Sequence, residues 1–529
     1  MSQVYPVLIG SGWKVSAGTR TFVAENPATG EALAGTYPVS PWSEVEQAIE
    51  AAHAAYRATR GWEGERFAKF LERYAELIEA AAGELVAMAN AETGLPVEPR
   101  LSKAELPRTV NQLRQAASAA RGGAWLHPII DRANNIRACF APIGPVCVFG
   151  PNNFPFAFNG IAGGDFAAAV AAGNPVIAKA HSSHPGTSRL FGEAAKRAAD
   201  ETGMPPGFVQ VLYRIEHADG ERLVSHRLIG ATGYTGARET GLVLKAAADR
   251  VGKPIYLELS SINPVVVLPG VLRERPDAMA DEFSSSCLMG TGQFCTNPGL
   301  VLLIEGPESE AFIEAVAERF RKAPVGTLLS RGVLGHLERS VTTIAGAGAR
   351  VVAGGAAGGG KGYSHQNTLL RATGTQFLDN PTAFQTEAFG NESLFVVVRD
   401  EAQLLAVLDE LEGNLTGAVY SAKDGSDDAL YARVAPPLRE KVGRLLNDKM
   451  PTGVAVSPAM NHGGPFPATG HPVFTAVGIP ASIRRFTRLE SYDAVRPERL
   501  PPALRDANPT GKLWREIDGV WTCADVVPA

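Results

Sequence analysis

Residues 142–156 read PIGPVCVFGPNNFPF, a short apolar run bounded on both sides by glycine and proline. Apolar runs of this length between turn residues are typical of buried strands. Three further apolar runs follow along the chain. A strand that is apolar throughout must be buried on both faces, which is typical of parallel sheets, so the pattern predicts a parallel sheet. These runs are NPVIAKA at 174–180, GFVQVLY at 207–213 and PIYLEL at 254–259.

Alanine-rich segments with helical periodicity separate these runs and precede them. They predict helices over Asp165–Ala172, Thr187–Thr202 and Gly241–Asp249 between the strands. Amphipathic patterns upstream, within residues 40–122, predict further helices such as Val45–Ala54 and Ala68–Ala91. Strands that alternate with helices indicate a doubly wound α/β domain, a class that binds nucleotides at the carboxyl ends of its strands.

A second alternating region begins near Asn263 and predicts a second α/β domain. Its strand runs are NPVVVL at 263–268, LVLLIEG at 300–306 and LFVVV at 394–398, and its helices are Ser309–Lys322 and Glu401–Glu412. The segment GGAAGGGKG at 354–362 lacks the GxxxxGK[ST] spacing of a phosphate loop, so we expect a mobile surface loop there.

Size and charge limit the classes of function. A chain of 529 residues exceeds what one hydrophobic core supports, which favours two large domains. The formal net charge of −5 offers no electrostatic case for binding nucleic acid or an anionic membrane surface. A small molecule is therefore the expected ligand.

The cysteines and the N-terminus bear on the compartment. The five cysteines form no CxxC pair, so free thiols in a reducing compartment fit best. The first residues, MSQVYPVLIGSGW, lack the pattern of a secretory signal, and no apolar run reaches membrane-spanning length. We therefore expect a cytoplasmic protein without metal sites.

Three polar residues are candidates for catalysis. Cys295 lies in GQFCT at 292–296, where small and polar neighbours suit an exposed nucleophile better than a core thiol. Glu258 ends an apolar strand. A carboxylate at such a position is explained either by a role as general base or by a structural ion pair. Asn153, next to Asn152 on a turn, suits either that turn or an oxyanion site. His462 has no partner at ligand spacing, so we interpret it as a loop histidine near the substrate.

These motifs together resemble the aldehyde dehydrogenase superfamily. GPNNFPF, Lys179, YLELSS at 256–261, GQFCT and QTEAFG at 385–390 occur in that family's order and approximate spacing, and the resemblance runs from Asn26 to Ser491. It implies a cofactor-binding domain, a catalytic domain and a small β extension that joins subunits into a homodimer or homotetramer. The implied segments are 1–123 with 143–258, 259–474, and 124–142 with 475–529.

The resemblance also implies a mechanism. Cys295 becomes the nucleophile that forms a thioester, Glu258 the base for its hydrolysis, and Asn153 the oxyanion donor. Glu258 argues against a coenzyme A-acylating enzyme, because transfer to a thiol needs no hydrolytic base. A non-catalytic relative is a further alternative. The residues implied in cofactor binding are Lys179, Gly236, Glu387 and Phe389.

The cofactor is expected to be NADP at least as much as NAD. The chain has no GxGxxG after its first strand, and YTGARETG at 234–241 takes the place of the family's nicotinamide-side turn. Ser182 stands three residues after Lys179, where NAD-preferring relatives often carry glutamate. A hydroxyl tolerates a 2′-phosphate, which Lys179 or Arg214 could neutralise. The alternative is that Ser182 only caps the next helix.

The stretches at 154–188 and 461–470 resemble the branch that contains α-ketoglutaric semialdehyde (2,5-dioxovalerate) dehydrogenases and some bacterial long-chain aldehyde dehydrogenases. An acidic semialdehyde needs a cation near the entrance. Arg108 and Gln112, one turn apart on a helix expected over Pro107–Ala120, could supply it beside Phe154, although a solvated arginine is the simpler reading. The tail beyond Pro497 matches no motif.

Overall fold

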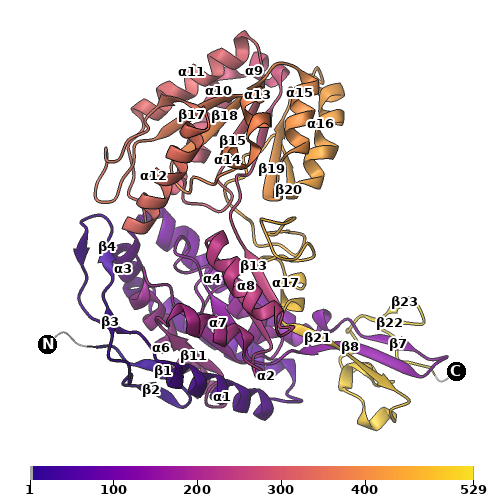
Figure 1. The fold of residues 1–529 in the computed structure, drawn as a ribbon. Helices are drawn as coiled ribbons and strands as arrows, with labels where there is room; N and C mark the ends of the chain where they lie inside the picture. The colour runs from indigo at the N-terminus through magenta and orange to yellow at the C-terminus, as the bar shows by residue number, and fades with distance from the viewer. Residues whose placement is uncertain (1–3, 528–529) are drawn as a thin grey trace.

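The computed structural model describes residues 4–527, so the outermost residues of the predicted segments 1–123 and 475–529 lie outside the described part. Two seven-stranded sheets and a five-stranded sheet organise the chain. Figure 1 shows the units around the two large sheets one above the other, with the smaller sheet projecting from the side of the lower one. The predicted α/β class is confirmed.

The first sheet contains the four apolar runs predicted as strands. Its order is β13-β12-β9-β10-β11-β1-β2, and β9 to β13 are mutually parallel, whereas β1 pairs antiparallel with β11. The bounds are β1 Val7–Ile9, β2 Gly12–Lys14, β9 Val146–Phe149, β10 Val176–Lys179, β11 Val209–Leu212, β12 Ala231–Thr235 and β13 Ile255–Glu258.

Helices cover both faces of this sheet, and their apolar stripes form one buried core with it. The helix expected over 68–91 is divided at Ala81, whose φ of −92° and ψ of 9° separate α2 from α3. The bounds are α1 Trp42–Ala58, α2 Gly64–Ala80, α3 Ala82–Thr93, α4 Leu106–Gly122, α5 Gly164–Ala171, α6 Pro185–Thr202, α7 His217–Ser225 and α8 Arg238–Asp249.

The second sheet has the order β16-β17-β18-β15-β14-β19-β20, and all its strands except β16 are parallel. The glycine-rich segment 354–362 follows β16 and is mostly exposed. The strands are β14 Val265–Val267, β15 Leu300–Ile304, β16 Arg350–Ala353, β17 Thr368–Thr373, β18 Glu392–Val398, β19 Asn414–Tyr420 and β20 Val442–Asn447. The helices are α9 Pro269–Glu274, α10 Pro276–Leu288, α11 Pro307–Lys322, α12 Arg331–Gly346, α13 Gly374–Asp379, α14 Pro381–Phe384, α15 Glu401–Asp409 and α16 Asp428–Glu440.

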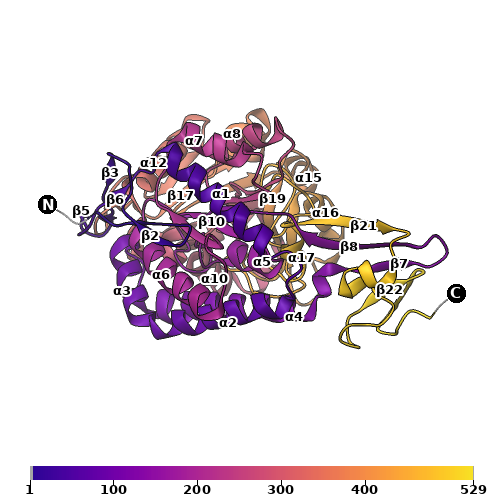
Figure 2. The same cartoon turned by 90° about the horizontal axis from the view of Figure 1, so that it is seen from below.

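The third sheet, of order β21-β8-β7-β22-β23, forms an extension that projects beyond the helical layer in Figure 2. The predicted hairpin is present as β7 (Ile129–Asp131) and β8 (Ile136–Pro142). The tail that matched no motif supplies β22 (Arg515–Ile517) and β23 (Val520–Thr522). The remaining strand, β21, spans Thr487–Asp493.

Residues 475–486 belong to a different layer from β21. Within them, α17 (Ala481–Arg484) packs on α5, and Arg485 forms a 2.7 Å ion pair with Asp165 of α5. This part of the segment therefore lies against the first-sheet unit. Among residues 4–527, no helix is both long and apolar enough to cross a membrane.

Candidate active site

The first sheet gathers candidate residues along one edge. In the ladder Lys179 pairs with Phe149 and Leu212, and Thr235 pairs with Glu258, so β9 to β13 end at the same level. Asn153 and Gly236 follow directly after β9 and β12. Ligands of doubly wound sheets bind at this edge, where the strand order reverses between β9 and β12.

Cys295 lies on a loop of the second-sheet unit, between α10 and β15. The preceding turn holds Gly290, Thr291 and Gly292 in succession in the left-handed region, with φ of 56°, 59° and 66°. A Cβ on Gly292 would lie 1.9 Å from the carbonyl oxygen of Gly390, so only glycine fits there. This contact brings the loop of Cys295 against the segment that carries Glu387.

Asn263 fixes the backbone on the other side of the nucleophile. Its Nδ2 donates to the carbonyl oxygens of Cys295 and Asn297, both at 2.9 Å. One buried amide thereby holds the residues on either side of Thr296. The thiol is presented by a loop that is hydrogen-bonded to the second-sheet unit rather than by a free surface turn.

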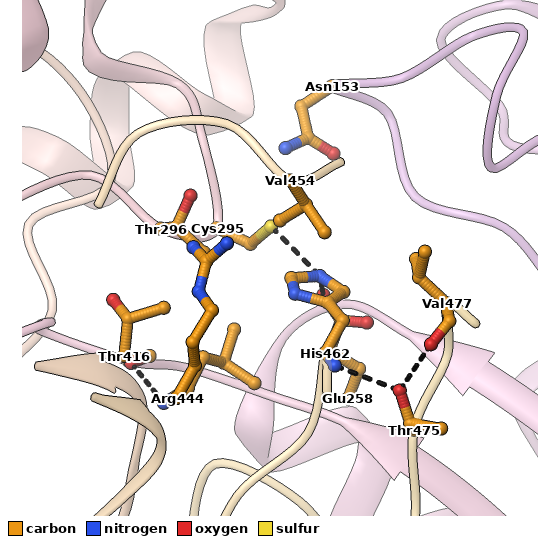
Figure 3. A network of polar contacts seen from close by, with 12 residues as sticks. Asn153, Glu258, Cys295, Thr296, Thr416, Arg444, Val454, His462, Thr475 and Val477 are labelled. Atoms are coloured by element: carbon orange, nitrogen blue, oxygen red, sulfur yellow. Dashed lines mark hydrogen bonds and ion pairs between the residues drawn. The ribbon is translucent and has the colours of Figure 1, made fainter. Parts of the chain in front are cut away.

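The thiol meets two buried partners. His462 Nε2 lies 2.9 Å from Glu258 Oε1 and 3.4 Å from Cys295 Sγ (Figure 3). The side chains of His462 and Glu258 are 1% and 2% exposed. One ligand-type atom from each of the three residues lies within 4.8 Å of the others. The two large units thus contribute to one cluster of three polar side chains.

His462 lies on a loop, as expected, but the sequence interpretation did not anticipate its contacts. Its ring touches both Cys295 and Glu258. Its backbone N–H donates to Thr475 Oγ1 at 2.8 Å, which holds the loop in place. The signal in the sequence is the glycine pair that follows. A Cβ on Gly463 or Gly464 would lie 2.1 or 2.3 Å from a backbone carbonyl oxygen.

The surroundings of Cys295 keep its thiol protonated in the resting site. Burial raises its pKa well above the ordinary value, and the charge of Glu258 and a hydrogen bond to it raise the pKa further. The positive charge of Arg108 acts in the opposite direction. The thiol therefore needs a base beside it before it can attack.

Asn153 is buried at 5% exposure above the nucleophile loop. Its Nδ2 donates to the backbone carbonyl of Gln293 at 3.1 Å, and the backbone carbonyl of Asn153 accepts from Arg100 Nη2 at 2.8 Å. A primary amide has two hydrogens, so one N–H of Asn153 is left for another acceptor.

Aromatic rings and one cation lie beside this site. The ring of Phe154 packs edge-on against Phe158 and Phe294, with centroids 5.3 and 5.5 Å apart. The Arg108 guanidinium lies 5.4 Å from the Phe158 centroid, and burial lowers its pKa. Arg108 is thus not a solvated helix residue. Gln112 is buried, donates to the Ala157 carbonyl at 3.0 Å, and lines a cavity with residues of the segment 476–479.

Glu387 and Phe389 line a second cavity, on the other side of the nucleophile loop, together with Phe294 and Ser261. Glu387 Oε1 accepts from the Ser261 backbone N–H at 3.3 Å. Burial raises the pKa of Glu387 to about 7, although hydrogen bonds from Ser260 and Ser261 oppose the shift. Within residues 4–527 no cation forms an ion pair with Glu387, although the charge of Arg238 acts on it, and such a carboxyl suits hydroxyl groups of a ligand.

Lys179 lies on the same sheet edge, separated from Glu258 by two strands, or roughly 14 Å at the usual strand spacing. Burial and the nearby charge of Arg214 lower its pKa to about 8. Ser182 does not cap α6, because that helix starts at Pro185 and its N-cap position, His184, makes no side-chain hydrogen bond. The capping alternative is wrong.

The carboxylate of Glu92 satisfies the start of α6 instead of Ser182. It accepts from the backbone N–H groups of Gly186 and Thr187 at 2.7 and 2.8 Å. Ser182 itself lies in the turn between β10 and α6, three residues beyond the last residue of β10. Its hydroxyl is therefore not needed to complete the helix.

Comparison with known proteins agrees with this geometry. The model of the aldehyde dehydrogenase family matches residues 13–458. The chain belongs to the aldehyde dehydrogenase family. An alpha-ketoglutaric semialdehyde dehydrogenase 2 of Azospirillum brasilense is 42% identical over 95% of this chain and 97% of its own length. An alpha-ketoglutaric semialdehyde dehydrogenase of Acinetobacter baylyi is 36% identical over 97% and 98%.

The fold agrees with that of solved aldehyde dehydrogenases. A 1-pyrroline-5-carboxylate dehydrogenase from Thermus, with bound NAD, superposes with a TM-score of 0.79 at 24% identity over 93% of each chain. The predicted family, fold and enzyme class are therefore confirmed, and family membership supports a nicotinamide cofactor. As an aldehyde dehydrogenase, the chain is an oxidoreductase.

Proposed function

We propose that this aldehyde dehydrogenase oxidises an acidic semialdehyde, α-ketoglutaric semialdehyde, to the dicarboxylic acid through a thioester on Cys295. The cluster of Cys295, Glu258 and His462 carries the proposal, because it pairs a nucleophile with a buried base. The names of the two relatives and the cation at Arg108 support an acidic substrate.

The first step needs a thiolate. Glu258 accepts the proton of the Cys295 thiol, and Sγ then forms a bond to the aldehyde carbon. The negative charge that develops on the aldehyde oxygen is stabilised by the free amide N–H of Asn153 and by the backbone N–H of Cys295. His462 Nε2–H stabilises whichever of the two neighbours is the anion.

Glu387, Phe389, Lys179 and the turn at Gly236 would hold the cofactor. The fit rests on the cavity beside Glu387 and on the uncapped start of α8, which follows Gly236 and offers backbone N–H groups to phosphate. The nicotinamide, when bound, supplies the acceptor for the hydride that the substrate loses. The acyl group then remains on Cys295 as a thioester.

Hydrolysis returns the enzyme to its resting state. Glu258 first releases to solvent the proton that it took from the thiol, which is the proton that the overall oxidation sets free. As a carboxylate again, it removes a proton from a water molecule, the water oxygen bonds to the acyl carbon, and the carbon–sulfur bond breaks. The proton returns to the thiolate and the carboxylic acid is released. A buried base so close to Cys295 supports hydrolysis over transfer to coenzyme A.

We propose NADP as a cofactor used at least as well as NAD. Lys179 and Arg214 place two positive charges near each other, and Ser182 brings no carboxylate that would repel a 2′-phosphate. Ser182 does not cap α6, so the helix does not require its hydroxyl, and this supports the preference. The second candidate substrate class is a medium- or long-chain fatty aldehyde, which the aromatic cluster around Phe154 favours.

We also propose a cytoplasmic homodimer or homotetramer. All five cysteines are free in the structure, which fits a reducing compartment. Strands β7, β8 and β21 of the third sheet expose large apolar side chains, a feature of surfaces that contact a partner. These are Ile129, Ile136 and Leu489.

Two variants test the mechanism. Cys295→Ala should abolish oxidation, because no nucleophile remains. Glu258→Gln should lower steady-state turnover by about a hundredfold or more while acyl-enzyme accumulates, as loss of a general base does. Mass spectrometry of acid-quenched enzyme measures the acyl adduct on Cys295. Full turnover by either variant, or an adduct on another residue, would overturn the assignment.

A further inference from the structure

Arg444 lies in β20, and its guanidinium has one N–H group without a hydrogen-bond acceptor among the described residues. Its Nη2 donates to the carbonyls of Pro451 and Gly453 at 3.0 and 3.2 Å, and its Nη1 contacts the weak acceptor Met460 Sδ at 3.6 Å. Its Nε is buried and has no hydrogen-bond partner among the described residues. A buried N–H without an acceptor costs free energy unless a ligand supplies one.

The guanidinium of Arg444 belongs to the neighbourhood of the nucleophile. Burial lowers its pKa, and the charge of Cys295 raises it, so the two groups interact across the site. The loop that Arg444 binds also touches the nucleophile loop, because the Gly453 N–H donates to Thr296 Oγ1 at 3.2 Å. Figure 3 shows Arg444 and His462 approaching Cys295 from different segments.

Arg108 reaches the same loop from the first-sheet unit. Its Nη1 donates to the Val454 carbonyl at 2.9 Å, next to the Gly453 carbonyl bound by Arg444. Its Nη2 is also buried without a partner. Two guanidinium groups thus bind adjacent carbonyls of one loop, and each keeps a buried N–H free. Burial shifts the pKa of both downward, yet arginine stays charged at neutral pH.

No carboxylate within residues 4–527 forms an ion pair with either group, and the acid closest in sequence, Glu105, already pairs with Arg100 at 3.2 Å. The charges of Glu105 and Glu258 act on Arg108 without direct contact, and positive charges that are largely removed from water without a directly bound carboxylate are costly. A ligand carboxylate can satisfy both, because it has two oxygens and accepts four hydrogen bonds.

We infer that Arg444 and Arg108 together bind the carboxylate of the substrate, one from each large unit, while its aldehyde carbon lies at Cys295. This inference rests on the proposed function and adds Arg444 as a specificity-determining residue. The loop 451–456 between the two arginines sets their separation. The clamp therefore selects short aldehydes that end in a carboxylate over neutral aldehydes of the same length.

Arg444→Met tests the clamp through a comparison of two substrates. The KM for α-ketoglutaric semialdehyde should rise about ten- to hundredfold, the range for a lost hydrogen bond to a charged group, with kcat changed less than threefold. The kcat/KM for pentanal should stay within about threefold of wild type. Binding of 2-oxoglutarate, the product acid, should weaken by the same factor in calorimetry.

Controls separate the clamp from a structural role. Arg439→Met removes a neighbouring arginine that donates to the Val442 carbonyl at the start of β20, and it should leave both substrates unaffected. Arg444→Lys keeps the charge and should recover part of the loss if Arg444→Met folds poorly. The Arg108→Met and Arg444→Met effects on KM should be non-additive, because both groups bind one carboxylate.

The outcomes distinguish failure of the clamp from failure of the proposed function. If the wild-type enzyme itself prefers pentanal to the acidic semialdehyde, the proposed substrate class is wrong, and the inference that the two arginines bind the substrate carboxylate is overturned as well. If the wild-type enzyme prefers the acidic substrate but Arg444→Met weakens both substrates equally, only the clamp is overturned, and Arg444 merely supports the loop.

Discussion

At the scale of single residues, one atom of His462 explains how the cluster works. The same Nε2 contacts Glu258 Oε1 and Cys295 Sγ, so a single N–H faces two groups that exchange a proton. With Glu258 ionised, the N–H donates to the carboxylate; once the thiol loses its proton to Glu258, the N–H can donate to the thiolate. His462 is thus a positioning residue for the proton transfer.

His462→Asn should therefore make the thiol harder to ionise. Burial and Glu258 already raise the pKa of Cys295, and removal of a donor to the thiolate raises the pKa further. Below the pKa, the rate of alkylation by iodoacetamide follows the thiolate fraction, so the variant should react about ten- to hundredfold more slowly at neutral pH. The two rates should converge as pH rises.

His462→Gln is the matched control, because its longer side chain places an amide N–H near the position of Nε2, which the asparagine amide does not reach, and it should recover part of the reactivity. If His462 only supports the fold of its loop, alkylation of Cys295 will have the wild-type pH profile in both variants. Such a result would remove the proton-transfer role while leaving Cys295 as the nucleophile.

At the scale of elements, the proposed cofactor preference rests on the turn between β10 and α6. Ser182→Glu should lower kcat/KM for NADP at least tenfold, because a carboxylate repels the 2′-phosphate, and change that for NAD less than threefold. Initial rates with each cofactor measure the ratio. Ser183→Glu, one residue along, is the control. Equal losses with both cofactors in Ser182→Glu would contradict the assignment.

The elements that sequence predicted well are those defined by local periodicity. The four strand runs of the first sheet and the helices between them depend on apolar patterns within a few residues, and each was found within a few residues of its expected bounds. Cys295, Glu258 and Asn153 could be predicted because each lies in a short motif. The three residues are far apart in the sequence, but the motifs that contain them together resemble one family, so they could be identified as candidates.

Long-range contacts could not be predicted in this way. Arg444 lies within β20 and His462 lies on a loop, and nothing in their local sequence reveals that both lie near Cys295. The glycine pair after His462 indicates only a closely packed loop. The strands of the tail beyond Pro497 could not be predicted either, because β22 pairs with β7, which lies nearly four hundred residues earlier in the sequence. Tertiary pairing, rather than propensity, determines these contacts.

At the scale of the whole molecule, unpaired strand edges indicate how copies of the chain assemble. Within the described residues, β21 pairs only with β8, and β20 pairs only with β19, so each leaves one edge free. Exposed edges of this kind pair with other strands unless they are protected. For the proposed dimer, we propose in addition that β21 of one subunit pairs with β20 of another, in a symmetric pair of contacts.

Leu489→Asp tests that arrangement, because Leu489 is 58% exposed on β21. A buried charge at the contact should raise the dimer dissociation constant at least tenfold and shift the mass in light scattering toward a single chain. Trp521→Asp, on β23 at the opposite edge of the third sheet and 50% exposed, should leave the dimer intact. Dissociation by Trp521→Asp but not by Leu489→Asp would place the subunit contact at the tail hairpin instead.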